Sequence, residues 1–149
     1  MIPLVNAAFA IETFLDGTRT DELRMSQMMR KGQFLVGEQG RRIAGAVYVE
    51  KRGERGYIGM LAIDPAQQGN GFGRMMMQAA ERHALGLGCR HVDITVLSLR
   101  PELPPLYRKL GYQETATEEF HPSQPLKPGV ACHSIVMSKS LESELLEDL

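Results

Sequence analysis

Three glycines at alternate positions, Gly69, Gly71 and Gly73, form the part of the sequence best suited to binding a ligand. They stand between a predicted strand over 57–64 and a predicted helix over 71–87. Because glycine has no Cβ atom, the backbone can curl until successive N–H groups converge on one anion. The positive end of the helix dipole adds to this attraction. The pattern therefore suits a pyrophosphate, although many strand-to-helix turns use glycine for structure alone.

Two well-known phosphate loops do not match this stretch. A Walker loop ends in Gly-Lys-Ser/Thr, whereas the chain has Gly73-Arg74-Met75. A dinucleotide fingerprint needs GxGxxG after the first strand of a βαβ unit and an acidic residue about 20 positions later. Here the spacing of the last glycine differs, and several predicted strands come before the loop. The sequence excludes both classes.

The elements that must position this loop follow from hydrophobic periodicity and turn residues. Helices are predicted over 2–15 and 21–31, and Leu23, Met25, Met28 and Met29 of the second are expected to face the core. Strands are predicted over 33–38, 42–50, 57–64, 91–98, 112–117 and 131–138, with further helices over 71–87 and 105–110. A proline-rich loop precedes the last strand, and an acidic tail covers about 140–149.

This order predicts a mixed α/β fold in one domain over 1–149. Three strands in series favour an antiparallel meander, and the helix over 71–87 allows the strands on either side of it to run parallel. The sheet is then mostly antiparallel, with one parallel pair and flanking helices.

Composition limits the class of partner and the compartment. The 149 residues are 43% hydrophobic and 23% charged, with a formal net charge of −1, so nucleic acid is not an expected partner. No apolar run reaches the roughly 20 residues of a membrane span, and the N-terminus lacks a basic signal-peptide region. Cys89 and Cys132 lie far apart, and the four histidines have no metal-ligand spacing. We expect a cytoplasmic protein with no metal and with reduced thiols, a single disulfide between the two cysteines being the alternative.

The segment Gln68-Gly69-Asn70-Gly71-Phe72-Gly73 resembles the Q/R-x-x-G-x-G/A signature of the GNAT family of N-acetyltransferases. The preceding Leu-Ala-Ile-Asp-Pro over 61–65 and the later Tyr-x-x-x-Gly-Tyr over 107–112 are similar to that family's supporting features. The resemblance covers about residues 4–138. It implies the acyl-CoA N-acyltransferase fold, in which the parallel strands splay apart. It also implies transfer of the acetyl group of acetyl-CoA to a primary amine, by direct attack within a ternary complex.

The resemblance also assigns residues. The pantetheine arm of acetyl-CoA would pair with the backbone of Met60, Leu61, Ala62 and Ile63. Backbone amides would hold the pyrophosphate, and they belong to Gln68, Gly69, Asn70, Gly71, Phe72, Gly73 and Arg74. The thioester would end near Ser98 and Tyr107, and Tyr107 would protonate the departing thiolate. Tyr107 can also be a packing residue, and Tyr112 is expected in the core.

The residue that accepts the amine's proton stays open. The candidates are the carboxylates Glu12, Glu50, Asp93 and Glu118 and the histidines His121 and His133. Arg19, between the first two helices, and Arg100 can each bind an acceptor carboxylate or form an ion pair within the fold. The identity of the acceptor amine cannot be read from the sequence.

One feature departs from the family. Its members normally begin with a strand, whereas this sequence starts almost at its first helix, so either the first edge strand is missing or the sequence starts after it. The strand over 33–38 would then be a bare edge, which makes a homodimer possible. Two other functions remain open: a non-catalytic acyl-CoA-binding regulatory module, and an interaction protein with a purely structural glycine turn.

Overall fold

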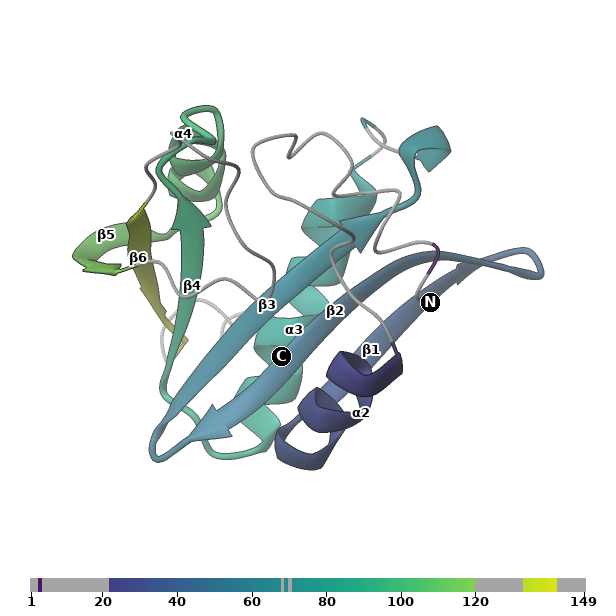
Figure 1. Cartoon of the computed structure of the whole chain (residues 1–149), viewed down its shortest axis with the longest axis horizontal. Coiled ribbons are helices and arrows are strands. Elements are labelled where there is room, and N and C mark those ends of the chain that lie inside the picture. Colours follow the sequence, from purple (N-terminus) through teal and green to yellow (C-terminus); the bar gives the residue numbers. More distant parts are fainter. Residues whose placement is uncertain (1–2, 4–21, 68, 70, 120–132, 142–149) are drawn as a thin grey trace.

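A computed structural model of the chain describes residues 3, 22–67, 69, 71–119 and 133–141 (Figure 1). Apart from residue 3, the predicted first helix lies outside these residues. So do the expected loss of an edge strand, the acidic tail after residue 141 and most of the proline-rich loop.

The described helices and strands follow the predicted order. They are α2 (Glu22–Lys31), β1 (Gln33–Gln39), β2 (Arg42–Arg52), β3 (Arg55–Ile63), the short 3₁₀ turn η1 (Pro65–Gln67), α3 (Phe72–Gly86), β4 (His91–Leu97), α4 (Leu103–Lys109), β5 (Gln113–Glu119) and β6 (His133–Ser140). Helix α4 begins two residues earlier than predicted, because its first turn accommodates Pro104 and Pro105. None of the described helices is long and apolar enough to cross a membrane.

The six described strands form one sheet in the order β1-β2-β3-β4-β6-β5. All neighbouring strands are antiparallel except β3 and β4, which confirms the predicted mixed sheet with one parallel pair. That parallel ladder is short: it pairs Arg55 with His91, Gly56 with Val92 and Tyr57 with Asp93. Beyond these pairs the two strands diverge (Figure 1).

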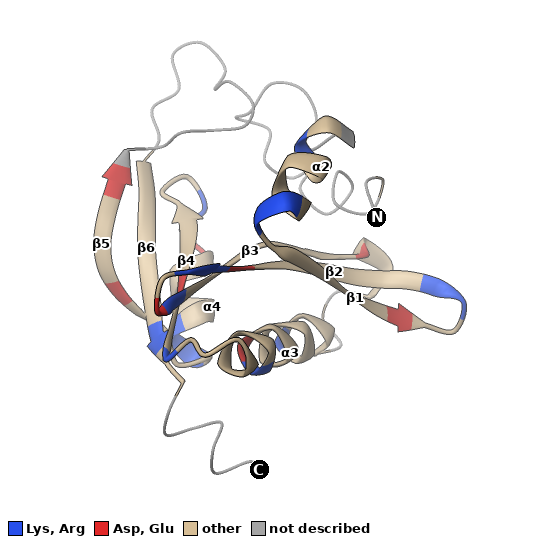
Figure 2. Ribbon diagram, turned by 90° about the horizontal axis from the view of Figure 1, so that it is seen from below, with Lys and Arg blue, Asp and Glu red and all other residues tan. Residues whose placement is uncertain are grey.

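Helices cover opposite faces of the sheet, with α3 on one side and α2 on the other (Figure 2). The pleat of β2 explains this arrangement, because successive side chains of a strand point to opposite faces. Val47 and Val49 belong to the core that packs on α3. Tyr48, between them, faces α2, where its hydroxyl lies 2.9 Å from the carbonyl oxygen of Met28. We refer to this second side of the sheet as the α2 face.

Helix α2 packs through a narrower stripe than its sequence predicts. Met25 is buried and Met28 is half-buried, as expected. A Cβ on Gly32 would come within 2.6 Å of the Tyr48 hydroxyl, so the chain approaches the sheet closely there. This stripe follows the three- and four-residue spacing of one helix face. Leu23 and Met29 flank it and are 69% and 59% exposed, so the prediction that they face the core was wrong.

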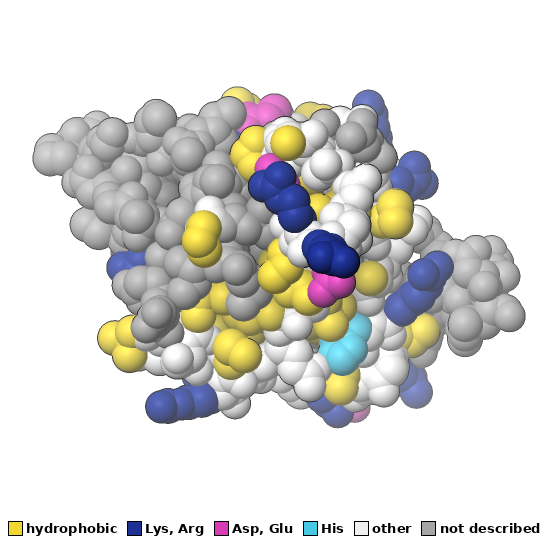
Figure 3. Space-filling view, turned by 90° about the vertical axis from the view of Figure 1, so that its right-hand side faces the viewer, with side chains coloured by type: hydrophobic (Ala, Val, Ile, Leu, Met, Phe, Trp, Pro, Cys, Tyr) yellow, Lys and Arg dark blue, Asp and Glu magenta, His cyan; other side chains and the backbone are white. Residues whose placement is uncertain are grey.

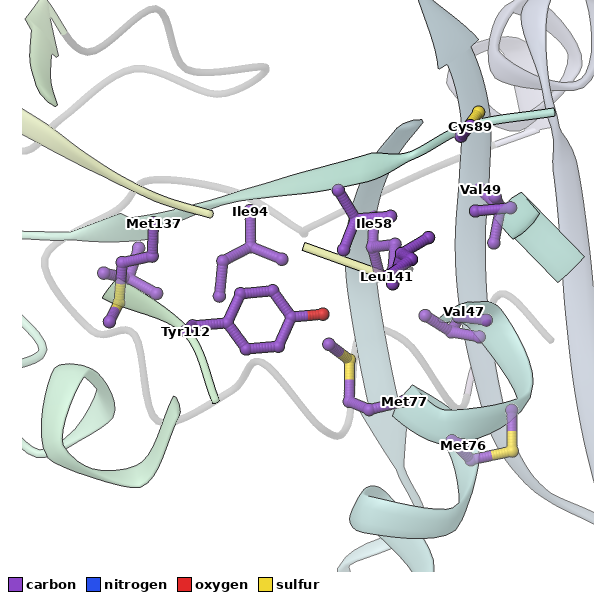
Figure 4. Close-up of a cluster of buried hydrophobic side chains, with 14 of the residues drawn as sticks. Val47, Val49, Ile58, Met76, Met77, Cys89, Ile94, Tyr112, Met137 and Leu141 are labelled. Atoms are coloured by element: carbon purple, nitrogen blue, oxygen red, sulfur yellow. The ribbon is translucent and has the colours of Figure 1, made fainter. Parts of the chain in front are cut away.

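The core lies between the sheet and α3 (Figure 4). Tyr112 is 1% exposed, which confirms its predicted place in the core, and its hydroxyl has no hydrogen-bond partner among the described residues. Near it, Lys139 of β6 bonds the buried carboxylate of Glu81 at 2.7 Å and places its ammonium 5.7 Å from the Tyr112 ring centre. This buried ion pair ties α3 to the far half of the sheet.

Candidate active site

A β-bulge interrupts β3 shortly after it leaves β4. In the pairing with β2, Gly59 lies opposite Tyr48 and Ala62 lies opposite Ala46. Met60 and Leu61 therefore face one residue of β2, and Met60 adopts a positive φ of 48°. A bulge of this kind bends its strand and re-aims the backbone groups next to it.

The bulge also decides which side chains of β3 reach each face. Ile58 and Ile63 both join the core on the α3 side, although a regular strand would place them on opposite faces. Gly59 and Ala62 lie on the α2 face, since their partners in β2 do. The side chain of Leu61 packs against the core.

The backbone of β3 beyond Tyr57 has one edge that no described strand occupies. Strand β4 turns away and pairs with β6 along its whole length, from His91 to Leu97. Along Leu61 and Ala62, that edge therefore has no ladder partner among the described strands. Their predicted role as a pairing surface for an extended amide chain fits this geometry.

The glycine loop lies where β3 ends and α3 begins. Gly69 and Gly71 have φ values of 88° and 75°, in the left-handed region that favours glycine. A Cβ placed on either residue would meet nothing within 4 Å, so open space lies beside both of them. Gly71 is the N-cap of α3 and supplies no side-chain cap. The first N–H groups of the helix are therefore left for another acceptor, which fits a pyrophosphate.

Two of the remaining loop residues, Phe72 and Arg74, are described by the structure. Gln68 and Asn70 are not among the described residues. The Phe72 ring packs under the sheet: a Cβ on Gly37 or Gly45 would come within 2.8 Å or 2.7 Å of it. The side chain of Phe72 is therefore directed at the sheet. Arg74 is exposed on the first turn of α3.

Tyr107 lies half-buried on α4, packed edge-on against Tyr112 with ring centres 6.0 Å apart. Burial raises the pKa of its phenol, and the nearby positive charge of Arg100 opposes that rise. The phenol accordingly keeps its proton at neutral pH. Arg100 itself pairs with Glu102 at 2.5 Å, so the structure gives it the ion pair that was one of its two predicted roles.

Ser98 follows β4 and joins it to the start of β6. Its backbone N–H donates to the carbonyl oxygen of His133 at 2.9 Å, and its Oγ accepts from the N–H of His133 at 3.0 Å. This places Ser98 at the end of β4 that lies farthest from the parallel ladder, just before α4. Ser98 and Tyr107 were predicted to lie near each other. The structure supports this only in that a short connection joins β4, which Ser98 follows, to α4, which carries Tyr107.

Two of the candidate bases are held in ion pairs. Glu50 is 7% exposed, and the Tyr48 hydroxyl lies 2.7 Å from its Oε1. Burial would raise the pKa of Glu50, but hydrogen bonds from Arg52 and Tyr48 and the charge of Arg52 outweigh it and lower that pKa. Both oxygens of Asp93 bond Arg55, at 2.8 Å and 2.6 Å.

The hydrogen bonds from Arg55 lower the pKa of Asp93, and the Ser138 hydroxyl, at 2.5 Å, adds to this. Carboxylates stabilised in their charged form are weak proton acceptors.

Glu118 is exposed on β5, and His133 is exposed at the start of β6. Glu12, His121 and Arg19 lie outside the described residues. Within the described part of the chain, no group of three or more His, Cys, Asp or Glu side chains is arranged to hold a metal ion.

Comparison with known proteins agrees with this geometry. The acetyltransferase (GNAT) family model matches residues 5–112. An acetyltransferase from Yersinia pestis (strain Pestoides F) is 30% identical over 84 residues, which are 56% of this chain and 60% of that protein. The matched segment thus covers less than two thirds of this relative.

Solved structures share the fold at low sequence identity. The smu.2055 protein of Streptococcus mutans UA159 superposes with a TM-score of 0.78 at 21% identity, covering 95% of this chain and 91% of that one. A GNAT family acetyltransferase from Elizabethkingia anophelis, solved with acetyl-CoA bound, gives 0.70 at 16% identity and covers 80% and 83%. Because the family model matches residues 5–112, which are most of the chain, the chain belongs to the GNAT family of acetyltransferases.

Proposed function

We propose that this protein is an N-acetyltransferase that moves the acetyl group of acetyl-CoA to a primary amine, acting as a single domain. One observation carries the proposal: the edge of β3 that no described strand occupies beyond Tyr57 leads, through the turn η1, into a glycine loop at a helix N-terminus without a side-chain cap. An extended amide chain attached to a pyrophosphate matches both parts. The family membership and the acetyl-CoA bound to the Elizabethkingia protein support this choice of ligand.

The chain's own groups divide the work of binding between two regions. Backbone N–H groups from residues 68–74 hold the pyrophosphate, aided by the α3 dipole. Leu61, Ala62 and Ile63 lie on the part of β3 beyond its ladder with β4, and their backbone pairs with the pantetheine amides, much as a peptide adds to a sheet edge. The thioester of acetyl-CoA supplies the acetyl carbonyl, which then lies beside the bulge at Met60.

Loss of a proton from the amine and gain of a proton by the thiolate are the two remaining tasks. An alkylammonium with a pKa near 10.4 must give up its proton at a cost of about 5 kcal/mol at pH 7. Since Glu50 and Asp93 are stabilised as anions, we favour a water that takes the proton and passes it on to bulk solvent, rather than direct transfer to either carboxylate. Tyr107, kept protonated by burial, donates to the leaving sulfur. A backbone N–H at the bulge can bond the developing oxyanion.

The test is release of free thiol from acetyl-CoA in the presence of a panel of amines, including small amines and short peptides with free N-termini. We expect at least one amine to raise the rate of thiol release above the rate with acetyl-CoA alone. A protein that binds CoA tightly and releases no thiol with any acceptor class would be a regulatory acyl-CoA-binding module. A protein without affinity for CoA would have a purely structural glycine turn.

We also propose that the protein forms a homodimer through the edge of β1 and acts in the cytoplasm. In the described part of the chain β1 pairs only with β2, and the half-exposed Val36 lies on that strand. Figure 3 shows hydrophobic side chains gathered on this side of the molecule. Light scattering on the wild type and on Val36→Lys tests the dimer: a charge placed at the interface should yield the monomer.

A further inference from the structure

The Tyr57 side chain lies at the point where β3 and β4 separate. Tyr57 and Asp93 are the last pair of the parallel ladder. On the α2 face the Tyr57 hydroxyl lies 3.3 Å from Oγ1 of Thr95, two residues further along β4. This contact bridges the two strands just beyond their last backbone pair.

The Tyr57 ring leans along β3 toward the bulge. A Cβ placed on Gly59, the next residue on the same face, would lie 2.8 Å from Cε1 of Tyr57 and 2.9 Å from its hydroxyl. Gly59 does not have a positive φ, so backbone conformation does not require glycine here. Its missing side chain makes room for the Tyr57 ring.

Neighbouring side chains hold the ring in this position. The Arg52 guanidinium stacks over it, 4.1 Å from the ring centre, and is itself anchored by the carboxylate of Glu50. The Tyr48 ring approaches at 6.5 Å between centres, at an angle of 65°. The Tyr57 hydroxyl also lies near Thr95, so the side chain is contacted on several sides. The ring cannot change its rotamer without breaking these contacts.

We propose that Tyr57 limits the length of the acyl chain, so that the protein uses acetyl-CoA and excludes acyl groups of four or more carbons. This inference rests on the proposed function. With the thioester beside the bulge at Met60, an acyl chain that continues along β3 away from the glycine loop meets the ring lying over Gly59. An acetyl group stops short of the ring, whereas a butyryl group has to displace it.

Because the acceptor is unidentified, the test measures binding. Dissociation constants for CoA, acetyl-CoA and butyryl-CoA are determined by calorimetry on the wild type and on Tyr57→Leu and Tyr57→Ala. We expect the wild type to bind butyryl-CoA at least about 10-fold more weakly than acetyl-CoA, a difference of about 1.4 kcal/mol. Tyr57→Ala should bring the two constants within about 2-fold. Tyr57→Leu keeps an apolar contact for its neighbours and serves if the alanine variant is unstable.

Two control variants test whether the Tyr57 ring itself, and not its hydroxyl or another ring on the same face, excludes the longer acyl chain. Tyr57→Phe keeps the ring and should keep the discrimination, although it loses the contact with Thr95. Phe34→Ala removes another ring of the same face, 5.1 Å from Tyr48 and on the far side of it from β4, and should also leave the ratio unchanged.

Several results would overturn the proposal. One is equal binding of acetyl-CoA and butyryl-CoA by the wild type. Another is unchanged exclusion of butyryl-CoA by folded Tyr57→Ala or Tyr57→Leu. If the wild type bound none of the three, the proposed function itself would fail, and that outcome differs from both.

Discussion

Gly37 of β1 and Gly45 of β2 lie directly opposite each other in the sheet, and both leave space for the ring of Phe72. Neither glycine has a positive φ, so the close approach of the ring explains them better than backbone conformation does. Phe72 is the first residue of α3 and follows Gly71. By allowing the Phe72 ring to lie close to the sheet, this glycine pair determines how far the loop and the N-terminus of α3 lie from the sheet.

Substitution of Gly45 with alanine should move the loop. The new Cβ would lie 2.7 Å from the Phe72 ring, which must shift and carry the start of α3 with it. We expect CoA affinity to fall about 10-fold, the loss of about one good hydrogen bond to a charged group. Affinity for acetyl-pantetheine, which lacks the pyrophosphate, should stay nearly constant.

Gly86→Ala is the matched control, since a Cβ at this other α3 position meets nothing within 4 Å. Calorimetry on both variants decides the matter. Equal losses of affinity for CoA and for acetyl-pantetheine in Gly45→Ala would point to general distortion of the fold.

Tyr107→Phe should separate chemistry from binding. Removing the phenol hydroxyl leaves the ring packed on Tyr112 but takes away the proposed proton donor. We expect the chemical rate to fall by roughly 10- to 1,000-fold, the range for one general acid, while CoA affinity changes no more than a few-fold. Single-turnover kinetics with an accepted amine measures the step. A variant with wild-type chemistry would make Tyr107 a packing residue.

The two buried tyrosines should respond differently to the same change. The Tyr48 hydroxyl lies near both Glu50 and the Met28 carbonyl, whereas the Tyr112 hydroxyl has no partner among the described residues. Tyr48→Phe should thus lower the free energy of unfolding by about 1–2 kcal/mol. Tyr112→Phe should leave it nearly unchanged or slightly higher, because it removes a desolvated polar group. Urea denaturation of both variants provides the comparison.

The Asp93–Arg55 pair should make stability depend on pH in the acid range. Since the hydrogen bonds from Arg55 lower the pKa of Asp93 in the folded state, the pair's contribution is complete above the unfolded value of about 3.9 and is lost as the pH falls through the lower folded value. Asp93→Asn should cost about 1 kcal/mol at pH 7. That difference should shrink below about pH 4. A difference that stays constant down to pH 2 would contradict the assigned pairing.

The sequence was sufficient for the order of the elements and for the loop. Hydrophobic periodicity and the punctuating glycines and prolines are local signals, so they predicted the described strands and the parallel pair. They could not predict the bulge at Met60, which depends on the register of β2 against β3, or the ring of Phe72 under Gly37 and Gly45, which depends on the packing of α3 against the sheet. The signal for the glycine pair was present: each glycine lies inside a predicted strand, where glycine often marks a close approach.

The candidate bases also show what could not be predicted from the sequence. Glu50 and Asp93 were equal candidates in the sequence. Arg55 lies close to Asp93 only because β3 and β4 are neighbours in the sheet. Arg52 follows Glu50 by two residues on the same face of β2, so that pair was a local signal that the sequence contained. Helix α2 gives a further example. Its four apolar side chains are alike in the sequence, but only those on the stripe through Met25 and Met28 reach the sheet.

The measurement that tests the central claim most directly is calorimetric titration of the wild type and of Gly71→Val with CoA. The claim is that the open space beside Gly71, at the uncapped start of α3, receives the pyrophosphate of the cosubstrate. We predict saturable binding by the wild type and a loss of at least about 100-fold in affinity in a folded Gly71→Val, since a branched side chain would fill the space and strain a positive φ. No binding by the wild type, or undiminished binding by the folded variant, would contradict the account.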